Sequence, residues 1–548
     1  SVTGHSTILF RAPYNADADP TDHEEIWPMI VASRRNYLFV GESIDPNDWQ
    51  QGVTADQIYQ RVIDGVHHED GHIILLHDAG GDTRKPTIEA LPRIIETLQH
   101  EGYQFISLEQ YLGMNKQTLM PAINKGKAYY AMQTNLWLAE MIYHVSDFLT
   151  ALFLVFLVLG MMRLVFMYVL TFREKRAENR RNYAPIDAAT APAVSIIVPG
   201  YNEEVNIVRT ITTLKQQDYP NLHIYFVDDG SKDHTLERVR EAFDTDDKVT
   251  VLAKKNGGKA SALNYGIAAC RSEYVVCIDA DTQLKQDAVS RLMKHFIADK
   301  DKRIGAVAGN VKVGNQRNML TYWQAIEYTS SQNFDRMAYS NINAITVVPG
   351  AIGAFRKEVI EEVGGFTTDT LAEDCDLTMS INEHGYIIEN ENYAVAMTEA
   401  PETLRQFVKQ RIRWCFGVMQ AFWKHRSSLF SPSKKGFGLW AMPNMLIFQY
   451  IIPTFSPLAD VLMLIGLFSG NALQIFFYYL IFLLIDASVS IMAYIFEGER
   501  LWVLLWVIPQ RFFYRWIMYY VLFKSYLKAI KGELQTWGVL KRTGHVGE

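Results

Sequence analysis

The spacing of apolar and polar residues changes several times along the chain, and each spacing predicts a different element. Residues 148–172, "FLTALFLVFLVLGMMRLVFMYVLTF", are almost entirely apolar and carry one charge, on Arg163. A run of more than about 18 nearly uncharged residues predicts a helix that spans a bilayer. Further apolar runs fill residues 437–530. The pattern therefore predicts an integral membrane protein, with a transmembrane helix over 145–172 and transmembrane or interfacial helices over 437–530.

Basic residues next to these runs predict the orientation. The stretch "FREKRAENRR" follows the first apolar run directly, and Lys- and Arg-rich flanks stay in the cytoplasm. We therefore expect a basic cytoplasmic linker over 173–192, an extracytoplasmic N-terminal part and a cytoplasmic tail over 531–548. Since the domain after residue 173 and the C-terminal tail are both expected in the cytoplasm, the chain between them must cross the membrane an even number of times. The apolar pattern of residues 437–530, however, predicts three helices. Residues 436–468 contain three prolines and are the candidate for an interfacial or re-entrant helix.

Between the apolar regions, short apolar strands alternate with amphipathic helical stretches from residue 193 to about 430. Such alternation predicts an α/β domain with a parallel sheet covered by helices on both faces. Ligands bind beyond the carboxyl ends of the strands in such sheets. Acidic pairs follow two of the predicted strands at this end, Asp228 with Asp229 and Asp279 with Asp281.

The stretch "VVCIDADTQL" raises the question of why two carboxylates stand one residue apart at a strand end. Asp279 and Asp281 repel each other unless a cation lies beside them. Their hard oxygen ligands suit Mg²⁺ or Mn²⁺, which commonly bridge nucleotide phosphates. An acidic turn that caps the next helix is the alternative for an isolated pair.

Three other motifs accompany this pair. In "KKNGGKASALNYG" two glycines precede Lys259 at a predicted helix start, which favours anions. In "TLAEDCDLT" Glu373 and Asp374 adjoin each other, and a carboxylate there could act as general base, although acidic residues also favour helix starts. In "QRIRW" Arg413 can balance a diphosphate and Trp414 can stack on a sugar ring, or the motif can anchor an interfacial helix.

With these motifs in this order, residues 193–423 resemble the processive family 2 glycosyltransferases of GT-A fold, which include cellulose, chitin, hyaluronan and poly-N-acetylglucosamine synthases. The resemblance implies Asp374, aided by Glu373, as the catalytic base and Asp281 with Asp279 as metal ligands. It implies a glycine-rich acceptor-side loop, "VVPGAIGAFR", and a further family stretch, "GNVKVGN". The UDP-sugar and acceptor residues that it implies are Asp228, Asp229, Lys259, Asp279, Gln410, Arg413 and Trp414 on the donor side and Gly350, Gly353 and Trp414 on the acceptor side.

The implied activity is the inverting transfer of a sugar from a UDP donor to a growing, β-linked polysaccharide, which the membrane helices would export. Alternatives are a non-processive transferase acting on a lipid carrier, and a receptor or transporter with an inactive transferase domain. The net charge of −7 disfavours a nucleic-acid partner. The four cysteines show no metal-ligand pairing.

The N-terminal part, residues 1–125, also alternates and resembles a polysaccharide deacetylase of the NodB type. Three pieces carry the likeness: "FRAPY" with Arg11, "DPNDW" with Asp48 and "ILLHD" with His77. In that family the Arg and Asp tune the catalytic groups and the His is a general acid. The family's metal-binding motifs normally precede the first piece, and only ten residues precede Arg11. We therefore expect a partial barrel, with Zn²⁺ bound only if a missing first half is present, and no deacetylase activity from this chain.

The company of a deacetylase-like domain indicates a polymer with N-acetyl groups. This favours UDP-N-acetylglucosamine as donor and disfavours cellulose, while hyaluronan would need two donors. An extracytoplasmic glycan-binding module is the alternative for the N-terminal part. Together these features predict a multi-pass protein of the cell membrane, with its transferase domain in the cytoplasm.

Overall fold

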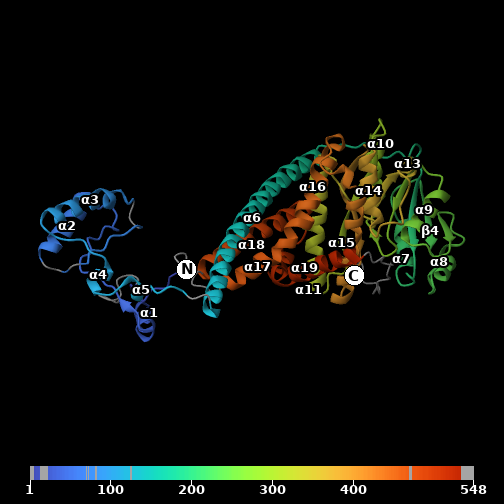
Figure 1. The fold of residues 1–548 in the computed structure, drawn as a ribbon. Helices are drawn as coiled ribbons and strands as arrows, with labels where there is room; N and C mark the ends of the chain where they lie inside the picture. The colour runs from blue at the N-terminus through green and yellow to red at the C-terminus, as the bar shows by residue number, and fades with distance from the viewer. Residues whose placement is uncertain are drawn as a thin grey trace. The chain divides into compact units, whose positions relative to one another are not determined.

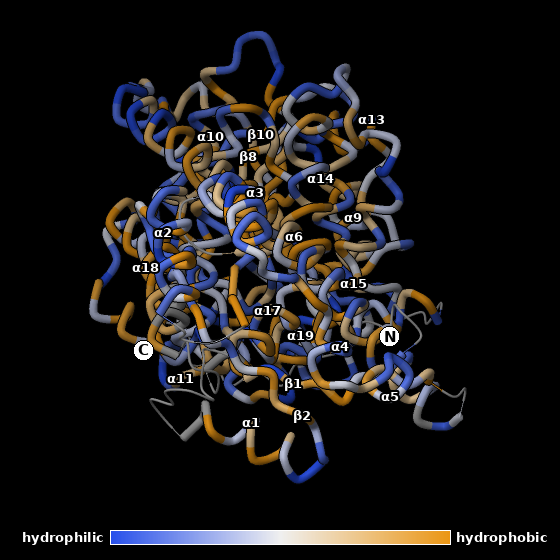
Figure 2. The backbone as a smooth tube through the Cα atoms, turned by 60° about the vertical axis from the view of Figure 1, so that its left-hand side comes forward, coloured by the Kyte–Doolittle hydropathy of each residue, from blue (hydrophilic) through white to orange (hydrophobic). Residues whose placement is uncertain are grey.

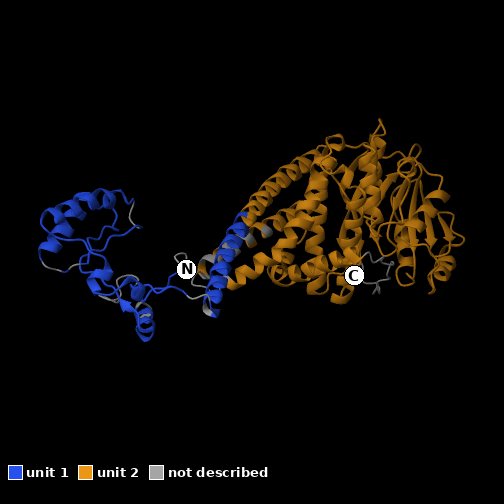
Figure 3. Ribbon diagram, viewed as in Figure 1, with its two compact units in different colours: residues 1–151 blue, residues 152–548 orange. Residues whose placement is uncertain are grey.

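The computed structural model describes residues 5–12, 23–68, 71, 73–79, 83–123, 126–467 and 472–531. The chain divides into two compact units, residues 1–151 and 152–548 (Figure 3). Beyond residue 531 the expected cytoplasmic tail lies outside the described residues, as do Pro13 and Tyr14 of the deacetylase-like motif.

The core of the first unit is a pair of amphipathic helices, α2 (Ala55–His67) and α3 (Lys85–His100). Thr54 caps α2 through a capping box, and the apolar faces of both helices join one buried cluster, which includes Ile58 and Ile94. The unit also contains α1 (His23–Arg34), α4 (Leu108–Leu112), α5 (Lys116–Leu119) and the short parallel strands β1 (Leu9–Phe10) and β2 (Leu38–Phe39).

The expected partial barrel stays a prediction. Among the described residues of this part, the strand pairings are short: β1 with β2, Ile44 with Ile74 and His5 with Ala122. The first two of these pairings are parallel, as in a barrel of alternating strands and helices.

Helix α6 runs without interruption from Lys127 to Glu178, so it extends past both ends of the predicted span 145–172 (Figure 1). Among the described residues, two helices are long and apolar enough to cross a membrane, Tyr129–Glu178 and Phe437–Ile465. Their apolar stretches, in α6 and α17, can be followed in orange in Figure 2. The second of these helices covers the proline-containing segment that the sequence pattern marked as interfacial.

The second unit contains an eight-stranded sheet in the order β5-β4-β3-β6-β9-β8-β10-β7. The strands are β3 (Val194–Gly200), β4 (Leu222–Asp228), β5 (Val249–Ala253), β6 (Tyr274–Cys277), β7 (Gln283–Leu284), β8 (Ile304–Val313), β9 (Gly353–Arg356) and β10 (Ile387–Thr398).

The sheet is parallel where the alternation predicted it, and it also contains two antiparallel strands. β9 runs antiparallel between β6 and β8, and β7 runs antiparallel to β10. The strands that the alternation located, β3 to β6, are parallel to one another. β9 follows the loop at Gly350, and the sequence pattern of β9 did not reveal its direction.

Helices cover both faces of this sheet because successive residues of each strand point to opposite sides. Ile196 and Val198 join the core under α7, α8 and α10, whereas Ile197 joins the core under α9 and α14. The bounds are α7 (Ile207–Lys215), α8 (Thr235–Phe243), α9 (Lys259–Ala269), α10 (Ala288–Ala298), α13 (Lys357–Glu362) and α14 (Glu373–Glu383).

The remaining helices either lie between the sheet and the apolar C-terminal block or form that block (Figure 1). They are α11 (Met319–Glu327), the π-helical η2 (Tyr328–Asn333), α12 (Phe334–Ser340), α15 (Leu404–Lys424), η3 (Arg426–Ser428), η4 (Pro432–Lys434), η5 (Phe437–Ala441), α16 (Met442–Asn444), η6 (Met445–Ile451), α17 (Ile452–Leu467), α18 (Ala472–Glu497), η7 (Leu501–Trp506) and α19 (Val507–Lys531).

Candidate functional site

The predicted motifs meet at Lys259, the first residue of α9. Its Nζ lies 2.6 Å from Asp279 Oδ1 and 3.1 Å from Glu373 Oε1. Burial disfavours the ammonium, but the carboxylates of Asp279, Glu373 and Asp374 outweigh it and raise the pKa of Lys259. The ammonium group of Lys259 therefore joins its own glycine–lysine motif to the Asp-x-Asp motif and to the Glu-Asp motif, which begins 114 residues further along the chain.

Asp374 lies in the first turn of α14, where its Oδ1 accepts from its neighbour's backbone amide, Cys375 N, at 2.8 Å. Its Oδ2 accepts from Gly350 N at 3.3 Å. Burial and then repulsion from Glu373 raise the pKa of Asp374 to about 6, although Lys259 opposes the shift. A carboxylate with a pKa near the working pH is suited to accept a proton in catalysis.

The two aspartates after β4 have different surroundings. Asp229 is fully engaged within the protein: its carboxylate accepts from Lys254 Nζ at 2.6 Å and from the backbone amides of Gly257 and Gly258. Asp228 accepts from the amide of Gly230 through Oδ2, while its buried Oδ1 has no hydrogen-bond partner among the described residues. Asp229 thus shapes the glycine loop, and Asp228 keeps one acceptor for a ligand.

The Asp-x-Asp residues fit a divalent cation. Asp281 is buried, with 4% of its surface exposed, and the Asp279 side chain is one-third exposed. Lys259 already balances the charge of Asp279, which answers part of the question that the sequence raised. The donor set consists of carboxylate oxygens, which Mg²⁺ and Mn²⁺ prefer.

Helix α15 carries the "QRIRW" motif near its first turns. Gln410 is buried and its Oε1 has no hydrogen-bond partner among the described residues, while Arg413 and Trp414 are half-buried. The Trp414 ring lies 6.4 Å from that of Tyr328, between centroids. The guanidinium of Arg411 lies 4.4 Å from the Trp414 ring and its Nη2 donates to Glu327 at 2.7 Å. Arg411, which sequence reasoning missed, therefore orients the tryptophan.

The two acceptor-side glycines have separate roles. A Cβ at Gly350 would lie 2.5 Å from Lys259 Nζ and 3.6 Å from Asp374 Oδ2, so this glycine borders the site. A Cβ at Gly353 would lie 2.6 Å from Val348 Cγ1, so this glycine lets the start of β9 pack against Val348. The structure thus brings Gly350 to the site, and Gly353 supports the strand behind it.

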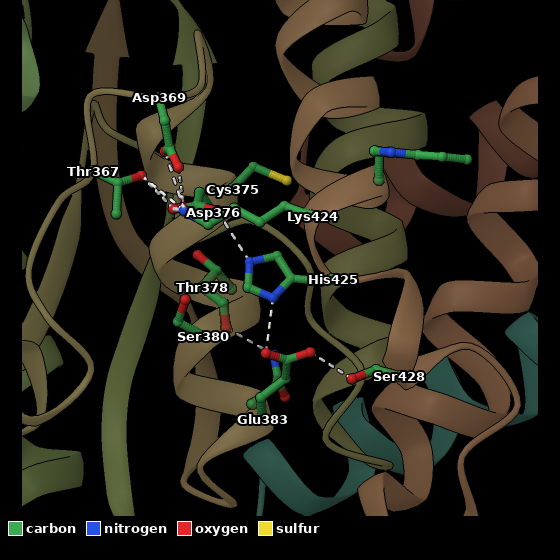
Figure 4. Close-up of polar contacts among 12 residues, drawn as sticks. Thr367, Asp369, Cys375, Asp376, Thr378, Ser380, Glu383, Lys424, His425 and Ser428 are labelled. Carbon is green, nitrogen blue, oxygen red and sulfur yellow. Dashed lines mark hydrogen bonds and ion pairs between the residues drawn. The ribbon is translucent and has the colours of Figure 1, made fainter.

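Sequence reasoning also missed a polar network that fastens α14 to the end of α15 (Figure 4). His425 contacts Asp376 Oδ1 at 3.0 Å through Nε2 and Glu383 Oε2 at 2.8 Å through Nδ1. Burial disfavours its imidazolium, but the two carboxylates raise the pKa of His425 to about 9. Lys424 adds an ion pair of 2.9 Å to Asp376. The sequence shows Asp376 and Glu383 only as two acidic residues on one predicted helix, and such residues by themselves indicate a helix face in contact with water.

A second contact zone lies N-terminal to this network. Gln420 Oε1 accepts from Leu371 N at 3.1 Å. A Cβ at Gly417 would lie 2.7 Å from Ala372 N, so α15 touches the turn that leads into Glu373. Helix α15 therefore carries Trp414 and at the same time fixes the helix that carries Asp374.

In the first unit the structure brings together two of the three predicted residues. His77 Nδ1 lies 2.8 Å from Asp48 Oδ1, and Thr87 Oγ1 donates to Asp48 Oδ2 at 2.8 Å. Burial favours the neutral form of Asp48, but these hydrogen bonds lower its pKa. Arg11 forms an ion pair with Glu42.

Asp48 and His77 also belong to a possible metal site. Among the described residues, Asp45, Asp48 and His77 form a group of three side chains of the metal-ligating types (His, Cys, Asp or Glu) close enough to hold a metal ion. Their potential ligand atoms lie within 4.8 Å of one another. Asp45 was noted in the sequence motif but not as a ligand. The Asp48–His77 hydrogen bond accounts for both side chains without a metal.

Comparison with known proteins adds independent observations. Residues 195–364 match the model of the glycosyl transferase family 2. The chain is 31% identical over 256 residues to the poly-β-1,6-N-acetyl-D-glucosamine synthase of Staphylococcus epidermidis, a match that covers 46% of this chain and 62% of that protein. It is 32% identical over 260 residues to the synthase of the same name from Staphylococcus aureus strain COL, which covers 47% of this chain and 61% of that protein. The matched part therefore spans less than two thirds of these relatives.

Among solved structures, a mannosyltransferase from Pyrobaculum calidifontis in complex with GDP-Man and Mn²⁺ aligns with a TM-score of 0.46 and 24% identity, over 64% of this chain and 95% of that chain. The matched family region begins in β3 and ends after α13, and so contains Asp228, Lys259, Asp279, Asp281 and Gly350. Residues 195–364 are therefore a region similar to glycosyl transferase family 2.

Proposed function

We propose that this protein is a membrane-embedded, processive, inverting glycosyltransferase that polymerises a β-linked N-acetylglucosamine polysaccharide from UDP-N-acetylglucosamine and exports it. The observation that carries the proposal is the set of contacts of the Lys259 ammonium group. They bring Asp279, expected on the donor side, close to Glu373 and Asp374, expected on the acceptor side. The names of the relatives, poly-β-1,6-N-acetyl-D-glucosamine synthases, support the choice of sugar.

Asp374 is the base in this proposal. Its carboxylate takes the proton of an acceptor hydroxyl, whose oxygen then attacks the anomeric carbon of the donor sugar. The bond from that carbon to the UDP oxygen breaks on the opposite face, so an α-linked donor gives a β-glycoside. The raised pKa of Asp374, about 6, supports this role, because its carboxylate is ionised yet basic near neutral pH.

The donor side uses Asp228, Asp279 and Arg413. The unpartnered Oδ1 of Asp228 is available to a donor group of the nucleotide, since a buried acceptor without a partner is costly. A divalent cation held by Asp281 and Asp279 would stabilise the negative charge of the departing diphosphate. Arg413 supplies a second positive charge from α15.

The acceptor side uses Trp414 and Gln410. Tyr328 and Arg411 hold the Trp414 ring, which offers its apolar face to a sugar. Gln410 Oε1 remains as a buried acceptor for a hydroxyl donor. The Gly350 loop stands against Asp374 and leaves room for the sugar because it has no Cβ.

A membrane location explains the apolar helices. A chain rich in hydroxyls cannot cross lipid unaided, because each unpaired polar group is costly there. The helices Tyr129–Glu178 and Phe437–Ile465 have the length and composition to cross a bilayer. We propose that they couple elongation to export, with the transferase domain in the cytoplasm and the N-terminal unit outside.

The N-terminal unit supports a polymer with N-acetyl groups. Its Asp48–His77 hydrogen bond of 2.8 Å pairs the same two residues that the deacetylase-like motifs singled out. We propose that this unit faces the exported polymer and binds it. This proposal and the staphylococcal relatives both favour an N-acetylated sugar over glucose.

The test places the full chain in nanodiscs with Mg²⁺ or Mn²⁺ and labelled UDP-N-acetylglucosamine alone. We expect labelled polymer of high molecular weight from the wild type and from Asp301→Asn, an exposed control, and none from Asp374→Asn. Linkage-specific glycosidases then identify the bond. Polymer from UDP-glucose alone would indicate a cellulose-type synthase, a need for two donors would indicate a hyaluronan type, and a short lipid-linked product would indicate a non-processive transferase.

A further inference from the structure

An exposed apolar rim lies where helix α15 leads into the helix Phe437–Ile465. Trp423 is 67% exposed, Phe430 61% and Leu439 52%. Phe430 has a positive φ of 58°, a conformation that bulky residues rarely adopt, and its amide donates to Gly438 O at 3.0 Å. The loop thus holds an aromatic side chain outward at a conformational cost. We call residues 423–439 the rim.

Contacts with α6 give the level of the rim. The Trp440 ring packs 4.2 Å from the Phe166 ring, between centroids, and Arg163 Nε donates to Asn444 Oδ1 at 2.8 Å. The first turns of Phe437–Ile465 therefore lie beside the last apolar turns of α6, whose apolar run ends at Phe172. Because charged residues begin there, the rim lies at the level where a bilayer's hydrocarbon gives way to headgroups.

Exposed basic side chains accompany the exposed rings. The Arg426 guanidinium lies 4.7 Å from the Trp423 ring, and Lys435 is exposed at the other end of the rim. On α6, Arg173 and Arg176 follow the end of the apolar run at Phe172 and are exposed. The chain as a whole carries −7, so this local positive charge runs against its average. Aromatic rings beside Arg and Lys at headgroup depth suit an anionic lipid surface.

We propose that the rim binds the phosphates of anionic phospholipid headgroups through Arg426 and Lys435, with Trp423 and Phe430 inserted between the lipids. Lys424 and Lys434 do not take part, since they bind Asp376 and the carbonyl of Glu383 within the protein. Arg426 donates to Trp423 O at 2.7 Å through Nη1 only, and its side chain is exposed, so the rest of its guanidinium can face a phosphate. The inference rests on the membrane-spanning arrangement in the proposed function. Its consequence is that α15, which carries Trp414, is tied at its far end to the membrane surface.

The experiment measures tryptophan fluorescence of the full chain in nanodiscs of phosphatidylcholine and phosphatidylglycerol, with bromine quenchers on one lipid or the other. The signal of Trp423 is the difference between the wild type and Trp423→Phe. We expect brominated phosphatidylglycerol to quench it more than brominated phosphatidylcholine. Each cation removed should reduce the preference for the anionic lipid by about fivefold, so Arg426→Gln/Lys435→Gln should quench equally with both lipids.

The control is Arg240→Gln/Lys248→Gln, which removes two exposed cations from the transferase domain and should keep the wild-type preference. Equal quenching by both lipids in the wild type, or no lipid-quenched emission from Trp423, would overturn the proposal. The readout needs no sugar. A protein that shows the lipid preference but makes no polymer would contradict the proposed function and not the lipid site. A protein that makes polymer without the preference would contradict the lipid site and not the proposed function.

Discussion

The backbone amide of Gly350 donates to Asp374 Oδ2 across 3.3 Å, so the loop expected to face the acceptor touches the carboxylate expected to act as base. Sequence separates these residues by 24 positions and a whole helix, α13. Their contact means that the position of the loop and the position of the carboxylate depend on each other. A change at Gly350 should therefore disturb the chemistry without unfolding the domain.

We expect Gly350→Ala to lower the transfer rate by about 10²-fold, because small misplacements of reacting groups have such effects. The new Cβ would lie 2.5 Å from Lys259 Nζ, which must then leave its carboxylates. The measurement is the initial rate of sugar transfer. Gly160→Ala, whose Cβ would meet no atom within 4 Å, is the matched control. A wild-type rate for Gly350→Ala would show that the loop is not part of the site.

The pH profile should report the base. Because Asp374 must be deprotonated to work and its pKa is raised to about 6, kcat/KM should fall about tenfold for each pH unit below 6 and level off above it. The measurement is kcat/KM for UDP-N-acetylglucosamine between about pH 4.5 and 8. A rate that stays level down to the pH at which an ordinary aspartate titrates would contradict the assignment.

Lys259→Met should move that acidic limb to higher pH. Lys259 opposes the rise in the pKa of Asp374, so its loss leaves burial and Glu373 to raise the pKa further. The rate should also fall because Asp279 and Glu373 lose their common cation. Lys255→Met, at an exposed position of the same motif, should keep the limb in place. A limb that moves to lower pH would mean that another group sets it.

The metal requirement should depend on Asp281. We expect chelation to abolish transfer by the wild type and added Mn²⁺ to restore it. Asp281→Asn should need a much higher Mn²⁺ concentration, because an amide oxygen binds the cation more weakly than a carboxylate. Half-saturating Mn²⁺ is the quantity to compare, with Asp301→Asn as control. Equal values for Asp281→Asn and the wild type would exclude Asp281 as a ligand.

His425 should make the second unit lose stability at alkaline pH. Its folded pKa, about 9, lies above the usual 6.5, so the stabilisation is fully present below 6.5 and is lost as pH rises through 9. The difference corresponds to roughly 3 kcal/mol. His425→Gln should therefore lower the apparent Tm near pH 6 and flatten its decline toward pH 9, as followed by fluorescence melts.

His384→Gln changes an exposed histidine at the C-terminal end of α14 and should melt as the wild type does. If His425→Gln keeps the wild-type pH dependence of Tm, the imidazolium between Asp376 and Glu383 is not the source of the stability. Transfer rates measured at a temperature well below both melting points would then show whether the network also positions Asp374.

The sequence by itself determined many of the elements of the α/β domain and which residues are candidates for its site. Apolar runs of strand length ended in acidic pairs, and the helices between them started where glycine or polar residues allowed, so β3, β4, β5, β6 and α9 all appeared at the predicted places. Periodicity reports local structure reliably because it reflects which face each residue buries. The motifs named Asp279, Lys259 and Asp374 as members of one site.

Tertiary structure alone decided what those residues do to one another. The packing of α9, α14 and α15 places Lys259 between Asp279 and Glu373, binds Asp229 to the glycine loop and lays Arg411 against Trp414. The antiparallel β9 and the His425 network were hidden for the same reason. Both depend on contacts between segments far apart in the chain, and neither strand direction nor ion pairing leaves a periodic trace in a single segment.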